Sequence, residues 1–361
     1  MKLTVQLQLL PGADRDLLLA TMQAFNAAAS HAARVGFEAA VFSQPAIHRR
    51  CYYELRERYG LSAQMAVRAI AKAVECLARD RRRCPVFRPH GAITYDERIL
   101  SWKGLARVSV WTLESRKVLP YVFGEYQRER LDRLKGQVDL VYRRGRFYLL
   151  ATIDMPEGAP ITPAQFMGID LGVANLATTS DGERMSGAGV EAVRVKYARV
   201  RRSLGKRMSR EHKRRTRKNA RRAMKRIGNR EQRFRRHTNH CISKTIVACA
   251  KDTGRGIALE DLSGIRDRTR FRRRQRARLG GWAFAQLRGF VEYKAKLAGV
   301  PVVLVDARNT SRTCAECGHC EQANRQGQSA FNCRSCGYVA HADHNAARNI
   351  ARRGASVNTP E

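Results

Sequence analysis

Apolar and polar side chains alternate from Lys2 to Leu9, which is the period of a half-buried β-strand. The turn-forming residues Pro11 and Gly12 end this pattern. Along residues 14–83 the apolar side chains recur at intervals of three and four, which is the period of an amphipathic helix. We therefore predict one strand followed by an insertion of three or four helices.

Short strands separated by turns return after this helical insertion. The alternating segments predict strands at residues 92–95, 107–112 and 118–123, and a hairpin that pairs residues 138–142 with residues 147–153. Together with the first strand, these segments would form a small β-barrel that the helices interrupt.

Two apolar strands further along the chain each carry one carboxylate. Residues 166–179 contain Asp170 and turn at Gly172, and the shorter strand at residues 256–262 has Glu260 near its end. An acid in such a strand is costly to bury unless it is hydrogen-bonded, paired or bound to a metal ion. Taken alone, Asp170 is equally consistent with a satisfied structural acid and with a metal ligand.

A third acid stands at the start of the last predicted helix. After a basic stretch at residues 266–278, the pattern predicts a helix over residues 282–298 and a strand over residues 301–305. Asp343 then precedes a helical segment, and an acid at this position is typical of a helix N-terminus. Alone, Asp343 would be a helix cap.

The charge of the chain points to a polyanionic partner. Its 361 residues include 69 Lys and Arg against 32 Asp and Glu, a net charge of +37. A chain this basic is expected to bind nucleic acid and to neutralise its phosphate charges. A membrane surface is the alternative, but the sequence has no run of 18 apolar residues and no apolar signal region. We therefore expect no membrane span and a soluble intracellular protein, long enough for two or three domains.

The cationic side chains are concentrated in residues 194–236. Apolar residues recur there at roughly helical spacing, which favours long basic helices lying along a phosphate backbone over a disordered tail. The candidate phosphate contacts are Arg201, Arg202, Lys206, Arg207, Arg214, Arg215, Arg221, Arg222 and Lys225. In the helical insertion, Tyr52 and Gln64 could stack on bases or hydrogen-bond with them, although ordinary packing or surface roles are the simpler interpretation.

Four cysteines form the strongest local motif. Cys314 and Cys317 make one C-x-x-C pair, Cys333 and Cys336 make a second, and fifteen residues separate the pairs. This spacing allows four thiolates to surround one Zn²⁺, in a structural site because no position remains for water. Cys320 also forms a C-x-x-C pair with Cys317, but we interpret it and the neighbouring histidine as bystanders.

The three acids together indicate phosphodiester hydrolysis. Two Mg²⁺ ions can activate water and stabilise the leaving oxygen, and these hard cations prefer carboxylate ligands. We predict that Asp170, Glu260 and Asp343 are the catalytic ligands of both ions, with Asp170 bridging them. Acids at adjacent strand ends, with a helix N-terminus beside them, are typical of an RNase H-like nuclease core.

Five motifs then resemble one family. GIDLGVANLATTSDG, ALEDLSGI, TSRTCAECG, FNCRSCG and DHNAARNI are similar, in this order, to the TnpB family, insertion-sequence-associated nucleases that share a RuvC-like core with miniature type V CRISPR effectors. The resemblance implies a multidomain α+β fold, in which an N-terminal wedge β-barrel with a helical insertion precedes an RNase H-like (RuvC) core with an inserted zinc ribbon. The implied segments are wedge barrel 1–10 and 86–160, recognition helices 11–85, nuclease core 161–312, zinc ribbon 313–338 and core helix with tail 339–361.

The resemblance implies an RNA-guided DNA endonuclease in a prokaryotic cytoplasm, associated with the nucleoid through DNA. Its partners would be a guide RNA and double-stranded target DNA, with one protein copy per RNA and a short target-adjacent motif. The family's catalytic positions fall on Asp170, Glu260 and Asp343, and its zinc ligands on the four cysteines. One departure is His341, where members often carry an acid. The last acid of that motif is present, so the departure affects only a neighbouring contact.

Three alternatives stay open from the sequence. A miniature type V CRISPR effector would share the chemistry and differ in the source of its guide. A nuclease-inactive guided repressor would be expected to lack one or more of the three acids, all of which are present. A transposase that itself moves DNA would also need acids and Mg²⁺, together with strand-transfer activity.

Overall fold

The computed structural model describes residues 1–210, 214–262 and 284–357. The chain forms two compact units, Met1–Pro156 and Glu157–Glu361. Among the described residues, no helix is both long and apolar enough to cross a lipid bilayer. The basic stretch at residues 266–278 and the first two residues of the helix predicted to start at residue 282 lie outside the described residues.

The first unit contains one antiparallel sheet of seven strands in the order β2-β6-β7-β1-β5-β4-β3. The strands are β1 (Lys2–Leu9), β2 (Ile93–Tyr95), β3 (Leu100–Lys103), β4 (Arg107–Trp111), β5 (Arg116–Val122), β6 (Leu134–Arg143) and β7 (Arg146–Asp154). As predicted, β1 joins the later strands, since it lies between β7 and β5. Strand β3 was not predicted from the sequence.

The sheet is curled, and β2 and β3 stand at the two ends of its strand order. Within residues 1–156 no strand pairing joins these two ends, so the predicted barrel is not closed by hydrogen bonds. The hairpin between β6 and β7 is as predicted. Its two turn residues, Arg144 and Gly145, both have positive φ (52° and 80°), as a tight hairpin turn that matches the strand twist requires.

Three helices separate β1 from β2, in agreement with the sequence pattern. They are α1 (Arg15–Glu38), α2 (Gln44–Tyr59) and α3 (Ala63–Arg79), and a short α4 (Glu125–Arg128) follows β5. The apolar faces of α1, α2 and α3 share a single core with one face of the sheet, in which Leu7, Phe25 and Ile70 are almost fully buried. Burial of that apolar surface is the dominant favourable contribution to the folding of this unit.

The second unit contains a mixed five-stranded sheet in the order β10-β9-β8-β11-β12. The strands are β8 (Phe166–Asp170), β9 (Asn175–Thr179), β10 (Arg184–Ser186), β11 (Gly256–Glu260) and β12 (Val302–Val305). β8, β11 and β12 are parallel, whereas β9 and β10 run antiparallel to their neighbours. The helices are α5 (Ala188–Arg210), α6 (Arg214–Ile227), α7 (Arg230–Asp252), α10 (Phe284–Ala298) and α11 (Ala342–Val357).

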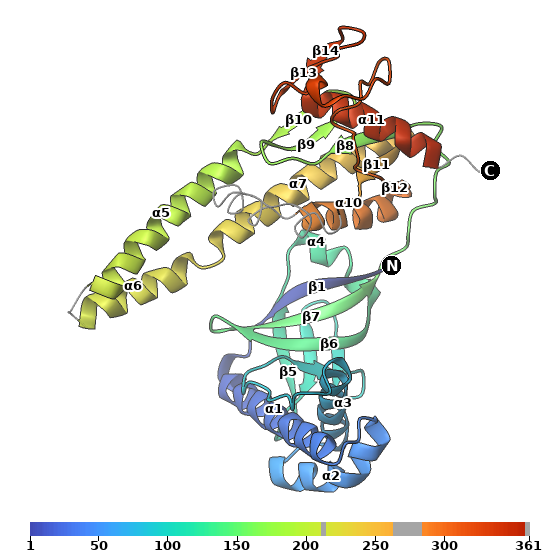
Figure 1. Ribbon diagram of the computed structural model, residues 1–361. Helices are drawn as coiled ribbons and strands as arrows, with labels where there is room; N and C mark the ends of the chain where they lie inside the picture. The colour runs from blue at the N-terminus through green and yellow to red at the C-terminus, as the bar shows by residue number, and fades with distance from the viewer. Residues whose placement is uncertain (211–213, 263–283, 358–361) are drawn as a thin grey trace. The chain divides into compact units, whose positions relative to one another are not determined.

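Helices cover both faces of this sheet (Figure 1). Met167 and Ile257 point to the face that packs on α7 and α10, and Phe166 and Ala258 point to the face that packs on Ile350 of α11. Alternate residues of one strand therefore serve two separate cores, which explains why these strands are apolar along nearly their whole length.

Glycine allows α11 to lie unusually close to β8. A Cβ atom built on Gly168 would overlap the carbonyl oxygen of Ala347 in α11, and one built on Gly354 would lie 2.6 Å from Cβ of Ala258. Only a residue without a side chain fits between a strand and a helix at this separation. The position of α11 over β8 and β11 thus depends on both glycines.

Candidate active site

Two of the predicted acids end neighbouring parallel strands. Asp170 is the last residue of β8 and Glu260 is the last residue of β11. The register pairs Ile169 with Leu259, so the two acids leave the sheet at the same edge. Parallel strands thus place both carboxylates together, although they are far apart in sequence.

The third acid reaches this edge from α11. Asp343 is the second residue of that helix, and its Oδ2 accepts a hydrogen bond from Nδ2 of Asn175 (2.9 Å), the first residue of β9. Asn175 lies on the strand next to β8, so this bond brings the start of α11 beside Asp170. The structure therefore brings together all three acids that the sequence singled out.

The pKa of Asp170 reflects this crowding. Burial is the first cause and the nearby negative charges of Glu260 and Asp343 are the next, and together they raise the pKa of Asp170 to about 8. Burial also raises the pKa of Glu260, against the hydrogen bond from Thr310. Arg325 opposes both shifts, because its positive charge favours the ionised carboxylates. The charges that act on Asp170 are thus two carboxylates and one guanidinium, and Arg353 also acts on Glu260.

Three residues near the acids were not predicted from the sequence. Oγ1 of Thr310 donates to Oε1 of Glu260 (2.5 Å), Asn175 donates to Asp343, and Arg325 lies close enough to affect two of the acids. Thr310 and Asn175 do belong to quoted motifs, TSRTC and GVANL. No local signal marks Arg325, because the residues that it faces are distant in the chain.

The three acids of this cluster are the residue type that binds hard cations. Three carboxylates supply the oxygen ligands that such ions prefer. Thr178 pairs directly with Asp170 across the β8–β9 ladder, so both side chains leave on the same face. Its hydroxyl oxygen is buried and has no hydrogen-bond partner among the described residues. A buried hydroxyl of this kind can be satisfied by a water molecule or by an ion.

The four predicted cysteines come together in the second unit. The ligand atoms of Cys314, Cys317, Cys333 and Cys336 all lie within 4.8 Å of one another. Two sulfur pairs, Cys314 with Cys336 and Cys317 with Cys333, are 3.7 and 3.6 Å apart. Tetrahedral coordination with metal–sulfur bonds of about 2.3 Å requires sulfur atoms about 3.8 Å apart, so the cluster fits one zinc-sized ion.

The two C-x-x-C pairs have the same backbone geometry. The amide of Gly318 donates to the carbonyl of Cys314, and the amide of Gly337 donates to the carbonyl of Cys333 (3.0 and 3.1 Å). Both glycines have positive φ, 77° and 70°. The exposed Cys320 lies outside this cluster, which agrees with its interpretation as a bystander.

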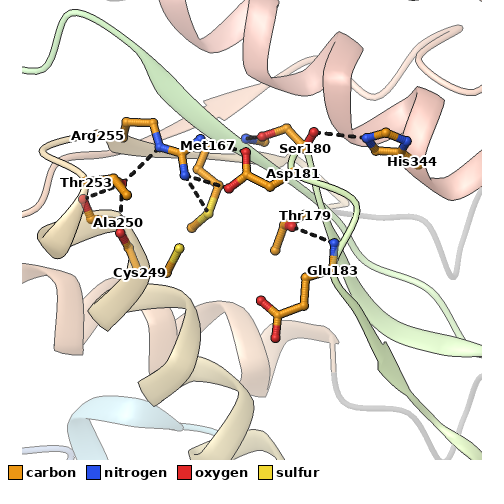
Figure 2. A network of polar contacts seen from close by, with 11 residues as sticks. Met167, Thr179, Ser180, Asp181, Glu183, Cys249, Ala250, Thr253, Arg255 and His344 are labelled. Carbon is orange, nitrogen blue, oxygen red and sulfur yellow. Dashed lines mark hydrogen bonds and ion pairs between the residues drawn. The ribbon is translucent and has the colours of Figure 1, made fainter.

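The turn between β9 and β10 is fixed at two points (Figure 2). Arg255, which follows α7, donates to both carboxylate oxygens of Asp181 (2.8 and 2.6 Å), and this contact holds the pKa of Asp181 below its usual value. Nε2 of His344 donates to the carbonyl oxygen of Ser180 (3.0 Å). His344 follows Asp343 directly, so this hydrogen bond connects the β9–β10 turn to the first helical turn of α11.

The predicted basic helices are present as α5 and α6, which pack against each other (Figure 1). Every candidate phosphate contact on them is exposed, and Arg201 forms an ion pair with Glu231 of α7 (2.8 Å). Side chains of α6 line a hollow of about 730 Å³, formed by Arg214, Arg215, Arg217, Lys218 and Arg221. The helices therefore present a cationic surface.

The two candidate base contacts of the first unit are engaged within the protein. Tyr52 stacks on His48 of the same helix, with ring centroids 4.3 Å apart. The amide nitrogen of Gln64 donates to Asp96, and its oxygen accepts from Arg98 (3.4 Å). Their predicted role with bases stays a prediction.

Comparisons with known proteins agree with the motifs. Residues 152–263 match the family model OrfB_IS605, described as a probable transposase, and residues 284–350 match the model of the Cas12f1-like TNB domain. The chain is 36% identical over 220 residues to a CRISPR-associated endodeoxyribonuclease Cas12f1 of Sulfoacidibacillus thermotolerans (58% of this chain, 50% of that protein). It is 32% identical over 230 residues to the putative RNA-guided DNA endonuclease InsQ of Escherichia coli K12 (59% and 55%).

The chain thus spans about half the length of the curated relatives that it matches. The fold is similar to that in a cryo-EM structure of a Cas12f1-sgRNA-target DNA complex, with a TM-score of 0.61, 15% identity and coverage of 94% of this chain and 83% of that chain. The resemblance to the TnpB family and to its miniature type V relatives is therefore confirmed, by family models over residues 152–263 and 284–350.

Proposed function

We propose that this protein is an RNA-guided DNA endonuclease that hydrolyses phosphodiester bonds of target DNA at a single RuvC-like site. The observation that carries the proposal is the meeting of Asp170, Glu260 and Asp343 at one edge of the mixed sheet. The name of InsQ, "putative RNA-guided DNA endonuclease", supports the activity, and the cationic surface of α5 and α6 supports a nucleic-acid partner.

In this proposal the three acids would hold two Mg²⁺ ions, with Asp170 as the shared ligand. Mg²⁺, when bound, supplies activation of the attacking water and stabilisation of charge on the leaving oxygen. Burial and the repulsion from Glu260 and Asp343 raise the pKa of Asp170, so a bound cation would favour the ionised form of this carboxylate. Arg325 is then suited to contact the phosphate that approaches the same cluster, because its charge already acts on Asp170 and Glu260.

The four cysteines would hold one structural Zn²⁺ and leave it no open position. The partners would be a guide RNA, with one protein copy per RNA, and double-stranded DNA that carries a short adjacent motif. Cations on α5 and α6 would contact phosphates and supply affinity without sequence information. Base pairing between the guide and one DNA strand would supply the target specificity.

The experiment that tests this function begins with the RNA that copurifies with the full chain, expressed with its native flanking DNA. We expect one abundant structured RNA with a variable 3′ segment, and cleavage of a plasmid that matches this segment in Mg²⁺. Random or absent RNA, together with cleavage that ignores the matching sequence, would contradict a guided nuclease.

One specific observation favours a second candidate, a miniature type V CRISPR effector. The 36% identity to a Cas12f1 exceeds the 32% identity to InsQ over similar lengths. Many short copurifying RNAs that share a repeat would favour this candidate.

The description of the OrfB_IS605 family raises a third candidate, a transposase that joins DNA ends. A donor–target joining assay tests it, and joined products would be required for this activity. A nuclease-inactive repressor fits less well, because all three acids are present and gathered at one edge.

A further inference from the structure

The three acids differ in how their oxygens are hydrogen-bonded. Oε1 of Glu260 accepts from Thr310 (2.5 Å), and Oδ2 of Asp343 accepts from Asn175 (2.9 Å). The carboxylate of Asp170 accepts no hydrogen bond from any described residue. Glu260 and Asp343 are therefore each held through one oxygen, whereas no described residue holds either oxygen of Asp170.

Both donors are uncharged, and this matters at a site for cations. A lysine or arginine in direct contact would neutralise the carboxylate and compete with a metal ion for it. A hydroxyl or an amide fixes one oxygen and leaves the negative charge in place. Nδ1 of His341 also lies 3.9 Å from Oδ2 of Asp343.

Thr310 is itself held rigidly. Its side chain is almost fully buried, and its carbonyl oxygen accepts from Nδ2 of Asn349 (2.9 Å) in α11. The same Nδ2 donates to the carbonyl oxygen of Thr313 (2.7 Å), one residue before the first cysteine of the metal-fitting cluster. The backbone of Thr310 is thus held by α11, and its Oγ1 also lies 3.1 Å from the carbonyl oxygen of Ala307.

Asn175 is anchored through its backbone. It starts β9 and pairs with Ser186 of β10. A Cβ atom on Gly172 would lie 2.7 Å from the carbonyl oxygen of Asn175, so the preceding turn packs tightly against this residue. The amide of Asn175 is therefore presented to α11 from a fixed point of the sheet.

We propose that Thr310 and Asn175 are positioning residues for metal binding. Each fixes one oxygen of its acid so that the other faces the ions, and Asp170 stays free of donors so that both of its oxygens can be shared. This inference rests on the proposed two-ion nuclease site and deepens it. It assigns a task to two residues that themselves touch neither the ions nor the substrate.

The test compares full-length variants in metal affinity. Thr310→Val removes the hydroxyl at nearly constant volume, Thr310→Ser restores it, and Asn175→Leu removes the amide. Thr179→Val is the matched control, because Thr179 is buried like Thr310 and ends β9, and the one bond to its hydroxyl among the described residues comes from the amide of Glu183 (3.2 Å). The readouts are binding of Mn²⁺ by paramagnetic resonance, the Mg²⁺ concentration for half-maximal cleavage, and the Tm.

We expect Thr310→Val and Asn175→Leu to weaken Mn²⁺ binding and to raise the Mg²⁺ requirement by about 10–100-fold, the usual cost of losing a hydrogen bond to a metal ligand. Thr310→Ser should recover most of this loss, and Thr179→Val should change only the Tm. Unchanged metal binding in both variants, or a loss in Thr179→Val of the same size, would overturn the inference. A wild-type protein that neither binds Mn²⁺ nor cuts DNA would instead overturn the proposed function.

Discussion

Asn345 and Asn349 lie one helical turn apart on α11, and both donate a side-chain N–H to the carbonyl oxygen of Thr313 (2.8 and 2.7 Å). Oδ1 of Asn345 also accepts from the amide of Ala315 (2.9 Å). Thr313 and Ala315 flank Cys314, so the helix that carries Asp343 also holds the first cysteine of the cluster. The metal-fitting cluster and the acidic cluster thus share one support.

Loss of the structural metal should therefore impair the acidic site. We expect Cys317→Ser to release the bound metal, lower the Tm and strongly reduce cleavage, because binding energy at a structural zinc site is folding energy. Cys320→Ser is the control and should behave as the wild type, since Cys320 lies outside the cluster. Zinc content, Tm and plasmid cleavage are measured together. Full activity in zinc-free, Mg²⁺-restored protein would contradict this coupling.

Removal of the central acid should separate cutting from binding. Asp170→Ala deletes the proposed shared ligand, so we expect cleavage to fall below detection while guide RNA still copurifies at wild-type yield. The RNA contacts are predicted on α5 and α6, whereas Asp170 belongs to β8, so the substitution leaves those contacts in place. Plasmid cleavage at the wild-type rate by this variant would show that the site has been assigned wrongly.

In the metal-free protein, ionisation of Asp170 should lower the free energy of unfolding as the pH rises. Its pKa is raised from 3.8 to about 8, so between those pH values the unfolded chain has lost a proton that the folded protein keeps. Stability contributed by this group is therefore present below about pH 4 and falls as the pH rises toward about 8.

Asp170→Asn removes this titration, and we expect it to raise the Tm of the EDTA-treated protein at pH 8 by several degrees and to leave the Tm nearly unchanged at pH 4. A change of 1 kcal/mol corresponds to about 2–4 °C in a domain of 150–250 residues. Calorimetry at both pH values measures the difference. An equal gain at both would argue against titration of this acid as the cause.

The close contact of α11 with β8 predicts a sensitive glycine. Gly168→Ala would place a Cβ atom against the carbonyl oxygen of Ala347, so we expect a loss of about 1–3 kcal/mol as the helix shifts outward. Gly205→Ala is the control, because nothing lies within 4 Å of the added atom in helix α5. Denaturant unfolding measures both variants, and a neutral Gly168→Ala would mean that the helix can move without cost.

The cationic surface of α5 and α6 predicts a strong salt dependence of RNA affinity. If about 6–10 phosphates are neutralised, affinity should fall roughly 10³–10⁵-fold between about 50 and 200 mM salt. The double variant Arg221→Gln, Arg222→Gln should reduce the log–log slope by about 1–2. A flat salt response of the wild-type protein would refute phosphate contacts as the main source of affinity.

The sequence predicted the strands and the helix that carry the acids, because each is marked by a local pattern. Asp170 and Glu260 interrupt apolar strands, and four cysteines at regular spacing define their own cluster. The partners of the acids could not be predicted in the same way. Thr310 lies 50 residues from Glu260, and Asn175 lies 168 residues from Asp343, so only the folded sheet shows that they touch.

Other differences have a similar origin. The sequence gives no sign that Gln64 is held by Asp96 and Arg98, since such bonds depend on how β2 and α3 pack. The short β3 was missed because four residues contain too few alternations to be distinguished from a loop. The curl of the first sheet is likewise set by pairings between distant strands rather than by any one segment.

The order of the acids along the chain has a consequence for how the protein is made. The cationic helices α5 and α6 lie between Asp170 and Glu260, and Asp343 and its supporting helix come later still. Because domains begin to fold while the chain is still being synthesised, a growing chain exposes its cationic helices before its acidic cluster can be complete. A ribosome-bound intermediate would thus be able to recruit RNA at a stage when it cannot yet cut DNA.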